Sequence, residues 1–161
     1  MPRPKKDAYI DESKIYRYWL RRQWNDGPRV VFILLNPSTA DANKDDATIR
    51  KCMSFARQWK YGTLDVVNLF AYRATDPRKL KGYNNPVGPE NDKWIVQTAR
   101  DADIVVAAWG NHGRFMARDE EVLNLLDRVS CLGITKARCP KHPLYVRLDT
   151  PLEYLIEPSG F

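Results

Sequence analysis

The sequence predicts an α/β fold, a single three-layer α/β/α domain around a mainly parallel, doubly wound sheet of four strands. Three apolar segments, at 29–36, 61–72 and 103–110, have the β-branched composition of buried strands. Segments of helical periodicity separate them, which is the order found in doubly wound sheets. The chain of 161 residues suffices for one core, so we expect residues 13–161 to form one domain.

The remaining elements follow from local sequence. Residues 1–12 are polar and basic, which indicates a flexible arm. Asp-Gly within the segment 25–28 separates two strand-like runs and predicts an N-terminal antiparallel hairpin between them. Apolar periodicity predicts helices over 45–59, 89–102 and 118–129, and short strands over 133–137 and 144–148.

Composition and charge limit the functions that the chain can have. A formal net charge of +6 and a sequence pI of about 9.3 favour a polyanionic partner such as DNA. The sequence has no apolar run of about eighteen residues and no signal-peptide pattern, so we expect a cytoplasmic protein with no membrane partner. Three cysteines and two histidines at unrelated spacings predict reduced thiols and no metal centre. We expect a monomer without a cofactor.

Amide side chains follow all three predicted buried strands. Asn36 precedes Pro37 after the first strand, Asn68 ends the second, and Asn111 with His112 follows the third. Ligands of doubly wound sheets bind beyond the carboxyl ends of the strands, so these residues form a predicted site. The phosphate-binding motifs GxxxxGK[ST] and GxGxxG and the hydrolase motif GxSxG are absent from the sequence.

Four of these segments resemble motifs of the uracil-DNA glycosylase superfamily, in the order found there. "LLNPSTA" resembles the first motif of the mismatch-specific branch, Gly-x-Asn-Pro-Gly, with a leucine and Ser38 in place of its glycines. "VVNLFAYRATDP" and "VVAAWGNHG" are similar to its second and third strands, and "KHPLYV" resembles its His-Pro-Ser loop. Through "NPSTAD", "DDATIR" and "VGPEND", the chain also resembles a widespread bacterial and phage family without an agreed function.

The resemblance implies a monofunctional DNA glycosylase-like hydrolase that flips out a uracil-related or modified pyrimidine and leaves an abasic site. The phage relatives suggest hypermodified bases as targets and antiviral defence as the setting. The implied substrate is single- or double-stranded DNA. The altered first motif is compatible with a large group on carbon five of the base.

The resemblance also implies roles for single residues. Asn36 would hold the attacking water, and His142 would donate a hydrogen bond to O2 of the departing base. Among the acids, Asp41 rather than Asp45 or Asp46 is expected to activate the water, because it is closest in sequence to the predicted site, and the sequence leaves open whether Asn36 or this acid positions the water. Base contacts are predicted for Asn68, Phe55 and Pro37. DNA contacts are predicted for Ser38, Thr39, Arg73, His112, Arg114, Arg138 and Lys141.

Each assignment has a structural alternative. Asn36 can cap a turn, Asn68 can satisfy buried loop backbone, and Phe55 can belong to the core. The aspartates can cap the helix that follows them, and His142 can lie on a basic surface loop. For the whole protein, a catalytically silent nucleic-acid-binding module and an enzyme acting on free nucleosides or nucleotides also fit the sequence.

Overall fold

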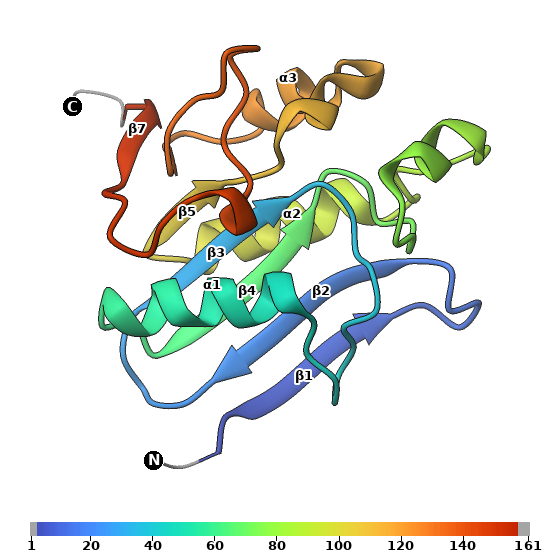
Figure 1. The fold of residues 1–161 in the computed structure, drawn as a ribbon. Helices are drawn as coiled ribbons and strands as arrows, with labels where there is room; N and C mark the ends of the chain where they lie inside the picture. The colour runs from blue at the N-terminus through green and yellow to red at the C-terminus, as the bar shows by residue number, and fades with distance from the viewer. Residues whose placement is uncertain (1–2, 158–161) are drawn as a thin grey trace.

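A seven-stranded mixed sheet forms the centre of the computed structural model, which describes residues 3–157 (Figure 1). The strand order is β1-β2-β4-β3-β5-β6-β7. The strands are β1 (Lys5–Ile10), β2 (Arg17–Gln23), β3 (Arg29–Leu34), β4 (Thr63–Asn68), β5 (Ile104–Ala107), β6 (Val129–Cys131) and β7 (Glu153–Ile156). The neighbours β4, β3, β5 and β6 run parallel, whereas β1, β2 and β7 pair antiparallel. The α/β class is confirmed, with a wider sheet than predicted.

Helices cover both faces of this sheet. On one face, α1 (Ala47–Gln58) packs its apolar side against Phe32 of β3. On the other, α2 (Asn91–Asp101) and α3 (Arg118–Leu123) pack against Val31 and Ile33. Successive residues of a strand point to opposite faces, so β3, which is apolar from Val30 to Leu34, must be covered from both sides. Three short 3-10 helices complete the fold: η1 (Pro77–Gly82), η2 (Asn111–Ala117) and η3 (Pro143–Tyr145).

Two expectations for the N-terminal part were wrong. Residues 5–10, expected within a flexible arm, form β1 and pair with β2. The predicted hairpin between β2 and β3 does not exist, because β4 lies between these strands. The reason is burial: β3 and β4 are buried along almost their whole length and take the centre of the sheet, whereas β2 alternates buried and half-buried residues. The antiparallel hairpin is therefore β1–β2.

The chain after α3 also differs from the prediction. α3 ends at Leu123, and β6 takes residues 129–131. The predicted strand 133–137 contributes a single bridge between Ile134 and Pro140, and 144–148 begins as η3 instead. Prolines cannot donate to a strand ladder, and two of them, Pro140 and Pro143, lie in this segment.

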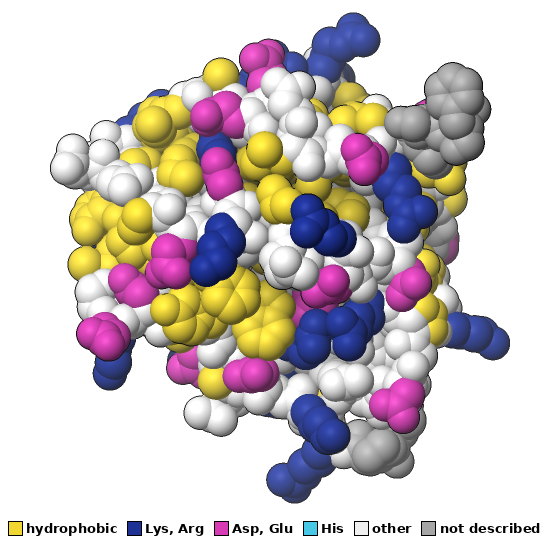
Figure 2. Space-filling view, turned by 180° about the vertical axis from the view of Figure 1, so that it is seen from behind, with side chains coloured by type: hydrophobic (Ala, Val, Ile, Leu, Met, Phe, Trp, Pro, Cys, Tyr) yellow, Lys and Arg dark blue, Asp and Glu magenta, His cyan; other side chains and the backbone are white. Residues whose placement is uncertain are grey.

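The face of the molecule opposite α1 mixes both signs of charge with hydrophobic side chains (Figure 2). An extended electrostatic interface with DNA would require lysine and arginine side chains gathered into one patch. On this face they are scattered instead. No helix in residues 3–157 is long and apolar enough to cross a bilayer.

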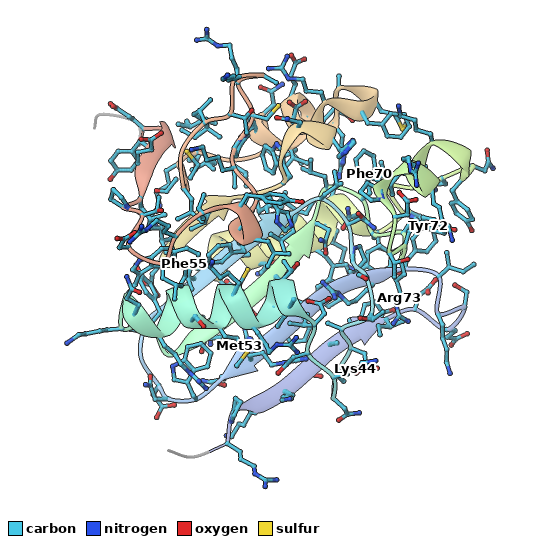
Figure 3. All side chains as sticks on the ribbon, in the orientation of Figure 1. Lys44, Met53, Phe55, Phe70, Tyr72 and Arg73 are labelled. Carbon is cyan, nitrogen blue, oxygen red and sulfur yellow. The ribbon has the colours of Figure 1, made fainter. Side chains whose placement is uncertain are left out.

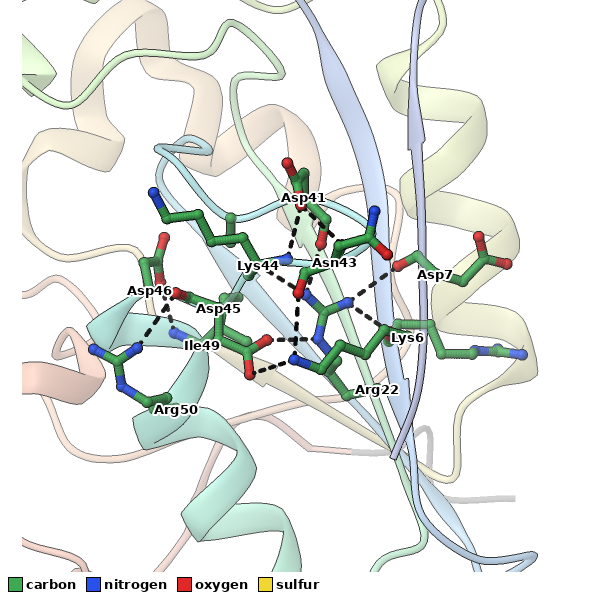
Figure 4. Close-up of polar contacts among 12 residues, drawn as sticks. Lys6, Asp7, Arg22, Asp41, Asn43, Lys44, Asp45, Asp46, Ile49 and Arg50 are labelled. Carbon is green, nitrogen blue, oxygen red and sulfur yellow. Dashed lines mark hydrogen bonds and ion pairs between the residues drawn. The ribbon is translucent and has the colours of Figure 1, made fainter. Parts of the chain in front are cut away.

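Arg22 of β2 fixes the segment that joins β3 to α1. Its side chain is fully buried and donates to the carboxylate of Asp45 at 2.7 Å (Figure 4). It also donates to the backbone carbonyls of Asp41 and Lys44, at 2.6 and 3.1 Å. Further bonds reach the carbonyls of Asp7 and Arg21. One buried cation therefore ties β1, β2 and the loop before α1 together.

The three aspartates of this loop have separate roles. Asp46 caps α1, because its Oδ1 accepts the N–H of Ile49 at 2.9 Å. Asp45 pairs with Arg22. Asp41 turns the loop, because its Oδ1 accepts hydrogen bonds from the backbone N–H groups of Asn43 and Lys44, each at 2.8 Å. These bonds lower the pKa of the Asp41 carboxyl below its ordinary value.

We expect Asp45→Ala to lower the free energy of unfolding by about 3 kcal/mol, because it leaves the buried Arg22 without its carboxylate. Chemical denaturation monitored by circular dichroism would measure the change. The matched control is Arg147→Ala, which removes an ion pair with Asp149 between two exposed side chains. Equal, small effects for both variants would show that the Arg22 cluster does not stabilise the fold.

Candidate functional site

A pocket of about 800 Å³ opens at the carboxyl ends of the parallel strands. This is where ligands of open parallel sheets bind, as predicted. Its walls come from segments that follow β3, β4, β5 and β6, from the start of α1, and from Arg17 of β2. The main lining segments are 34–38, 46–49, 74–75, 109–112, 141–142 and 144–145.

Asn36 lines the pocket with a fixed amide orientation. Its Nδ2 donates to the backbone carbonyls of Pro37 and Ala74, at 3.1 and 2.8 Å. Both partners are acceptors, so the nitrogen must face them and the oxygen must face away. No donor in the described part of the chain bonds to Oδ1. This oxygen is free to accept a hydrogen bond from a water or a ligand.

His142 lines another wall and has a defined tautomer. It is the N-cap of η3, and its Nδ1 accepts the N–H of Leu144 at 3.2 Å. Burial lowers the pKa of His142 below its ordinary value, against the opposing charge of Asp46. The imidazole is therefore neutral at pH 7, and its proton sits on Nε2. Neutral Nε2–H is a hydrogen-bond donor for an oxygen in the pocket.

Gly110 allows the segment after β5 to pass close to His142. Its φ is +77°, a conformation that side chains other than glycine rarely adopt. A Cβ at this position would lie 3.7 Å from Cβ of His142. The Gly110 N–H donates to the carbonyl of Pro140 at 2.9 Å, which joins the two loops.

Asp46, and not Asp41, is the acid that lines the pocket. Oδ1 of Asp46 caps α1, while Oδ2 has no hydrogen bond from the described residues. The predicted catalytic carboxylate, Asp41, uses its Oδ1 within its own loop. The sequence does not separate the two, because both lie in the segment between Asn36 and the predicted helix.

Two of the residues predicted to contact the base lie outside the pocket lining. Phe55 is a fully buried residue of α1 (Figure 3). Its ring packs against Phe32 and Trp59. Asn68 is 1% exposed, and its Oδ1 accepts a hydrogen bond from Arg17 at 3.3 Å. Pro37, the third of this group, does line the pocket.

The predicted DNA contacts divide in the same way. Ser38, His112 and Lys141 line the pocket. Thr39 and Arg138 are exposed outside it. The remaining two hold neighbouring backbone: Arg73, placed in Figure 3, donates to the carbonyl of Lys14, and Arg114 donates to the carbonyl of Ala137.

Several pocket residues were not predicted as site residues, and three of them matter for the site. Arg17 is almost fully buried, although the sequence shows only a basic residue in an aromatic strand. Leu144 and Tyr145 of η3 are 44% and 85% exposed at the pocket rim. Two apolar side chains directly after His142 and Pro143 could have indicated a site residue pair in the sequence. We instead assigned them to the predicted strand over 144–148. Within residues 3–157, no group of three His, Cys, Asp or Glu side chains is placed to hold a metal ion.

The chain matches one family model, described as "Protein of unknown function (DUF1643)", over residues 17–144. The matched region extends from Arg17 of β2 to Leu144 of η3 and includes almost the whole pocket. No curated protein and no solved structure matches the chain.

We expect the pKa of His142 to lie below the ordinary histidine value, with the neutral proton on Nε2. Because folding lowers this pKa, the unfolded state binds the proton more readily. The associated stability is present above the ordinary pKa and is lost as pH falls through the lowered one. Side-chain nitrogen-15 NMR through a pH titration would measure both properties. A proton on Nδ1, or a pKa at or above the ordinary value, would contradict this assignment.

Proposed function

The chain belongs to the DUF1643 family, and we propose that it is a DNA glycosylase-like hydrolase of the uracil-DNA glycosylase type. Its substrate is a uracil-related or modified pyrimidine in DNA, and its product is an abasic site. In this proposal the parallel strands β4, β3, β5 and β6 form the doubly wound core of that fold. The protein acts as a monomer in the cytoplasm.

The observation that carries the proposal is the pairing of Asn36 and His142 in one pocket. One offers a free amide oxygen, and the other offers a neutral Nε2–H donor. Hydrolysis of an N-glycosidic bond needs an acceptor that positions water and a donor that stabilises the departing base. These two side chains supply both groups, on loops that follow different strands.

The reaction follows from these positions. A water held by Asn36 Oδ1 adds its oxygen to the sugar carbon C1′ as the bond from C1′ to the base nitrogen breaks. The bonding electron pair leaves on the base, where His142 donates a hydrogen bond to the pyrimidine O2. The free Oδ2 of Asp46 accepts the proton that the water loses, which an amide cannot do.

The pocket rim offers groups that suit a nucleotide turned out of its duplex. Lys141 and His112 provide positive or donor groups for backbone phosphates, and Ser38 provides a hydroxyl. The exposed Leu144 and Tyr145 are apolar side chains able to fill the space that a flipped base leaves in the stack.

The size of the pocket supports a substituted base. Small-molecule sites span about 300–1,000 Å³, and this pocket of about 800 Å³ lies in the upper part of that range. A bare pyrimidine occupies a small part of it. Together with the sequence resemblance to a family found in phages, this favours the hypermodified pyrimidines of phage DNA, with antiviral defence as the biological setting.

An abasic-site assay on oligonucleotides tests the proposal. Single- and double-stranded DNA would carry uracil, cytosine, or pyrimidines with small and large groups on carbon five, and alkali would cleave at each abasic site. Strand cleavage with at least one modified pyrimidine supports the glycosylase. Binding without base release favours a silent DNA-binding module, and turnover of free nucleosides alone favours a nucleoside enzyme.

We expect Asn36→Ala and His142→Ala each to reduce base release by about a hundredfold, the effect of losing one hydrogen bond made in the transition state. Single-turnover assays on a substrate that the wild type cleaves would measure this loss. The control is Gln97→Ala, because Gln97 lies on the exposed side of α2, away from the pocket. Full activity in both pocket variants would show that the site is wrongly placed.

We also expect DNA binding to weaken with salt, with a slope of about −4 to −5 in log affinity against log salt for about five neutralised phosphates. Replacing Lys141 and Arg138 by alanine together should reduce that slope by about 1 to 2. Fluorescence anisotropy across a salt series would measure it. An affinity that does not change with salt would remove DNA as the partner.

A further inference from the structure

Arg17 is a buried cation of the pocket without a carboxylate partner among residues 3–157. Its side chain is 2% exposed and donates to the carbonyl of Ala40 at 3.1 Å and to Oδ1 of Asn68 at 3.3 Å. Both partners are neutral, and its Nε–H has no hydrogen-bond partner in the described part of the chain. The other two buried arginines that the structure describes do have acids: Arg22 pairs with Asp45, and Arg118 pairs with Asp92.

A buried guanidinium with only neutral partners is unfavourable unless a ligand supplies the missing negative charge. A guanidinium has more N–H donors than these two partners use. A buried ion without a counter-charge is strongly destabilising. Burial lowers the pKa of Arg17 to about 10, so the group is still charged at neutral pH. The charges of Asp46 and Asp41 favour this cation, whereas those of Arg73 and Arg22 oppose it.

The neighbouring amide adds a second unsatisfied donor. Asn68 is fixed on one side, because its Oδ1 accepts the bond from Arg17. Its Nδ2 is buried and has no partner among the described residues. Two side chains that share a hydrogen bond therefore each have an unpaired donor, and the group that would satisfy such donors is an acceptor, best an anionic one.

We propose that Arg17 binds the negative charge of the pyrimidine as the base departs, so that the pocket prefers an anionic pyrimidine to a neutral one. This inference rests on the proposed function. The electron pair of the broken bond from C1′ to the base nitrogen delocalises onto the ring nitrogens and carbonyl oxygens. Arg17 donates hydrogen bonds to that charge and keeps its own proton. Asn68 is a positioning residue, which acts by orienting Arg17.

Uracil and 6-azauracil are the probes that test this inference. They have nearly the same shape, but the ring N–H of 6-azauracil is acidic enough to be ionised in mildly alkaline buffer. Isothermal titration calorimetry would compare their affinities for the full-length protein. We expect the wild type to bind 6-azauracil about tenfold tighter or more, the effect of one hydrogen bond between charged groups.

Three variants separate a charge effect from a folding effect. Arg17→Met removes the cation but keeps a long side chain. It should bind 6-azauracil and uracil with about equal affinity. Asn68→Asp changes one atom and places a carboxylate beside Arg17, which should remove the preference while keeping the arginine. Arg118→Met is the control, because it removes a buried arginine outside the pocket and should leave the preference unchanged.

The abasic-site assay, run on the same preparations, separates this inference from the proposed function. Base release without an anion preference in the wild type, or a preference that persists in folded Arg17→Met and Asn68→Asp, would overturn the role of Arg17 alone. An anion preference that depends on Arg17 but comes without base release would retain the anion site and reject the glycosylase. Failure to bind either base and to release any base would overturn both.

Discussion

The buried guanidinium of Arg22 is the constraint on which the pocket depends. It lies on β2 but bonds to the loop between β3 and α1, a segment that has few apolar residues of its own to bury. By fixing Asp45 and the carbonyls of Asp41 and Lys44 before it, Arg22 sets the start of α1. Asp46 follows directly and both caps that helix and lines the pocket. One ion cluster in the interior thus determines where a wall of the site lies.

The two buried arginines at opposite ends of β2 illustrate how one side chain type serves two purposes. Arg22 has a carboxylate and four backbone carbonyls around it, and it is a structural ion whose bonds leave little to offer a ligand. Arg17 has two neutral partners and faces the pocket. Burial raises the strength of any interaction that each can form, because water no longer competes for the charge. The difference in partners separates a residue that holds the fold from one that is available to bind.

Much of the fold was predictable from the sequence, because the apolar runs of β3, β4 and β5 are unambiguous and α1 and α2 have clear periodicity. The strand order was not predictable from the sequence. The Asp-Gly turn after β2 indicates a hairpin with β3, whereas the pairing of β2 with β4 depends on burial across the whole sheet. The position of Asn36 after β3 was predictable for the same reason as the apolar runs, whereas His142, the N-cap of η3, was predicted from the resemblance. The burial of Phe55 and Asn68, and the choice of Asp46 over Asp41, depend on side-chain direction, which spacing alone does not determine.

The central claim is that the strand-end pocket receives a pyrimidine turned out of DNA. The most direct measurement is a crystal structure of the protein with an oligonucleotide whose target nucleotide carries a 2′-fluoro group, which slows cleavage of the glycosidic bond. We expect a flipped base between Asn36 and His142, with its O2 toward His142 and the neighbouring phosphate toward Lys141. DNA bound on another face, or a base still stacked in the duplex above an unchanged pocket, would contradict it.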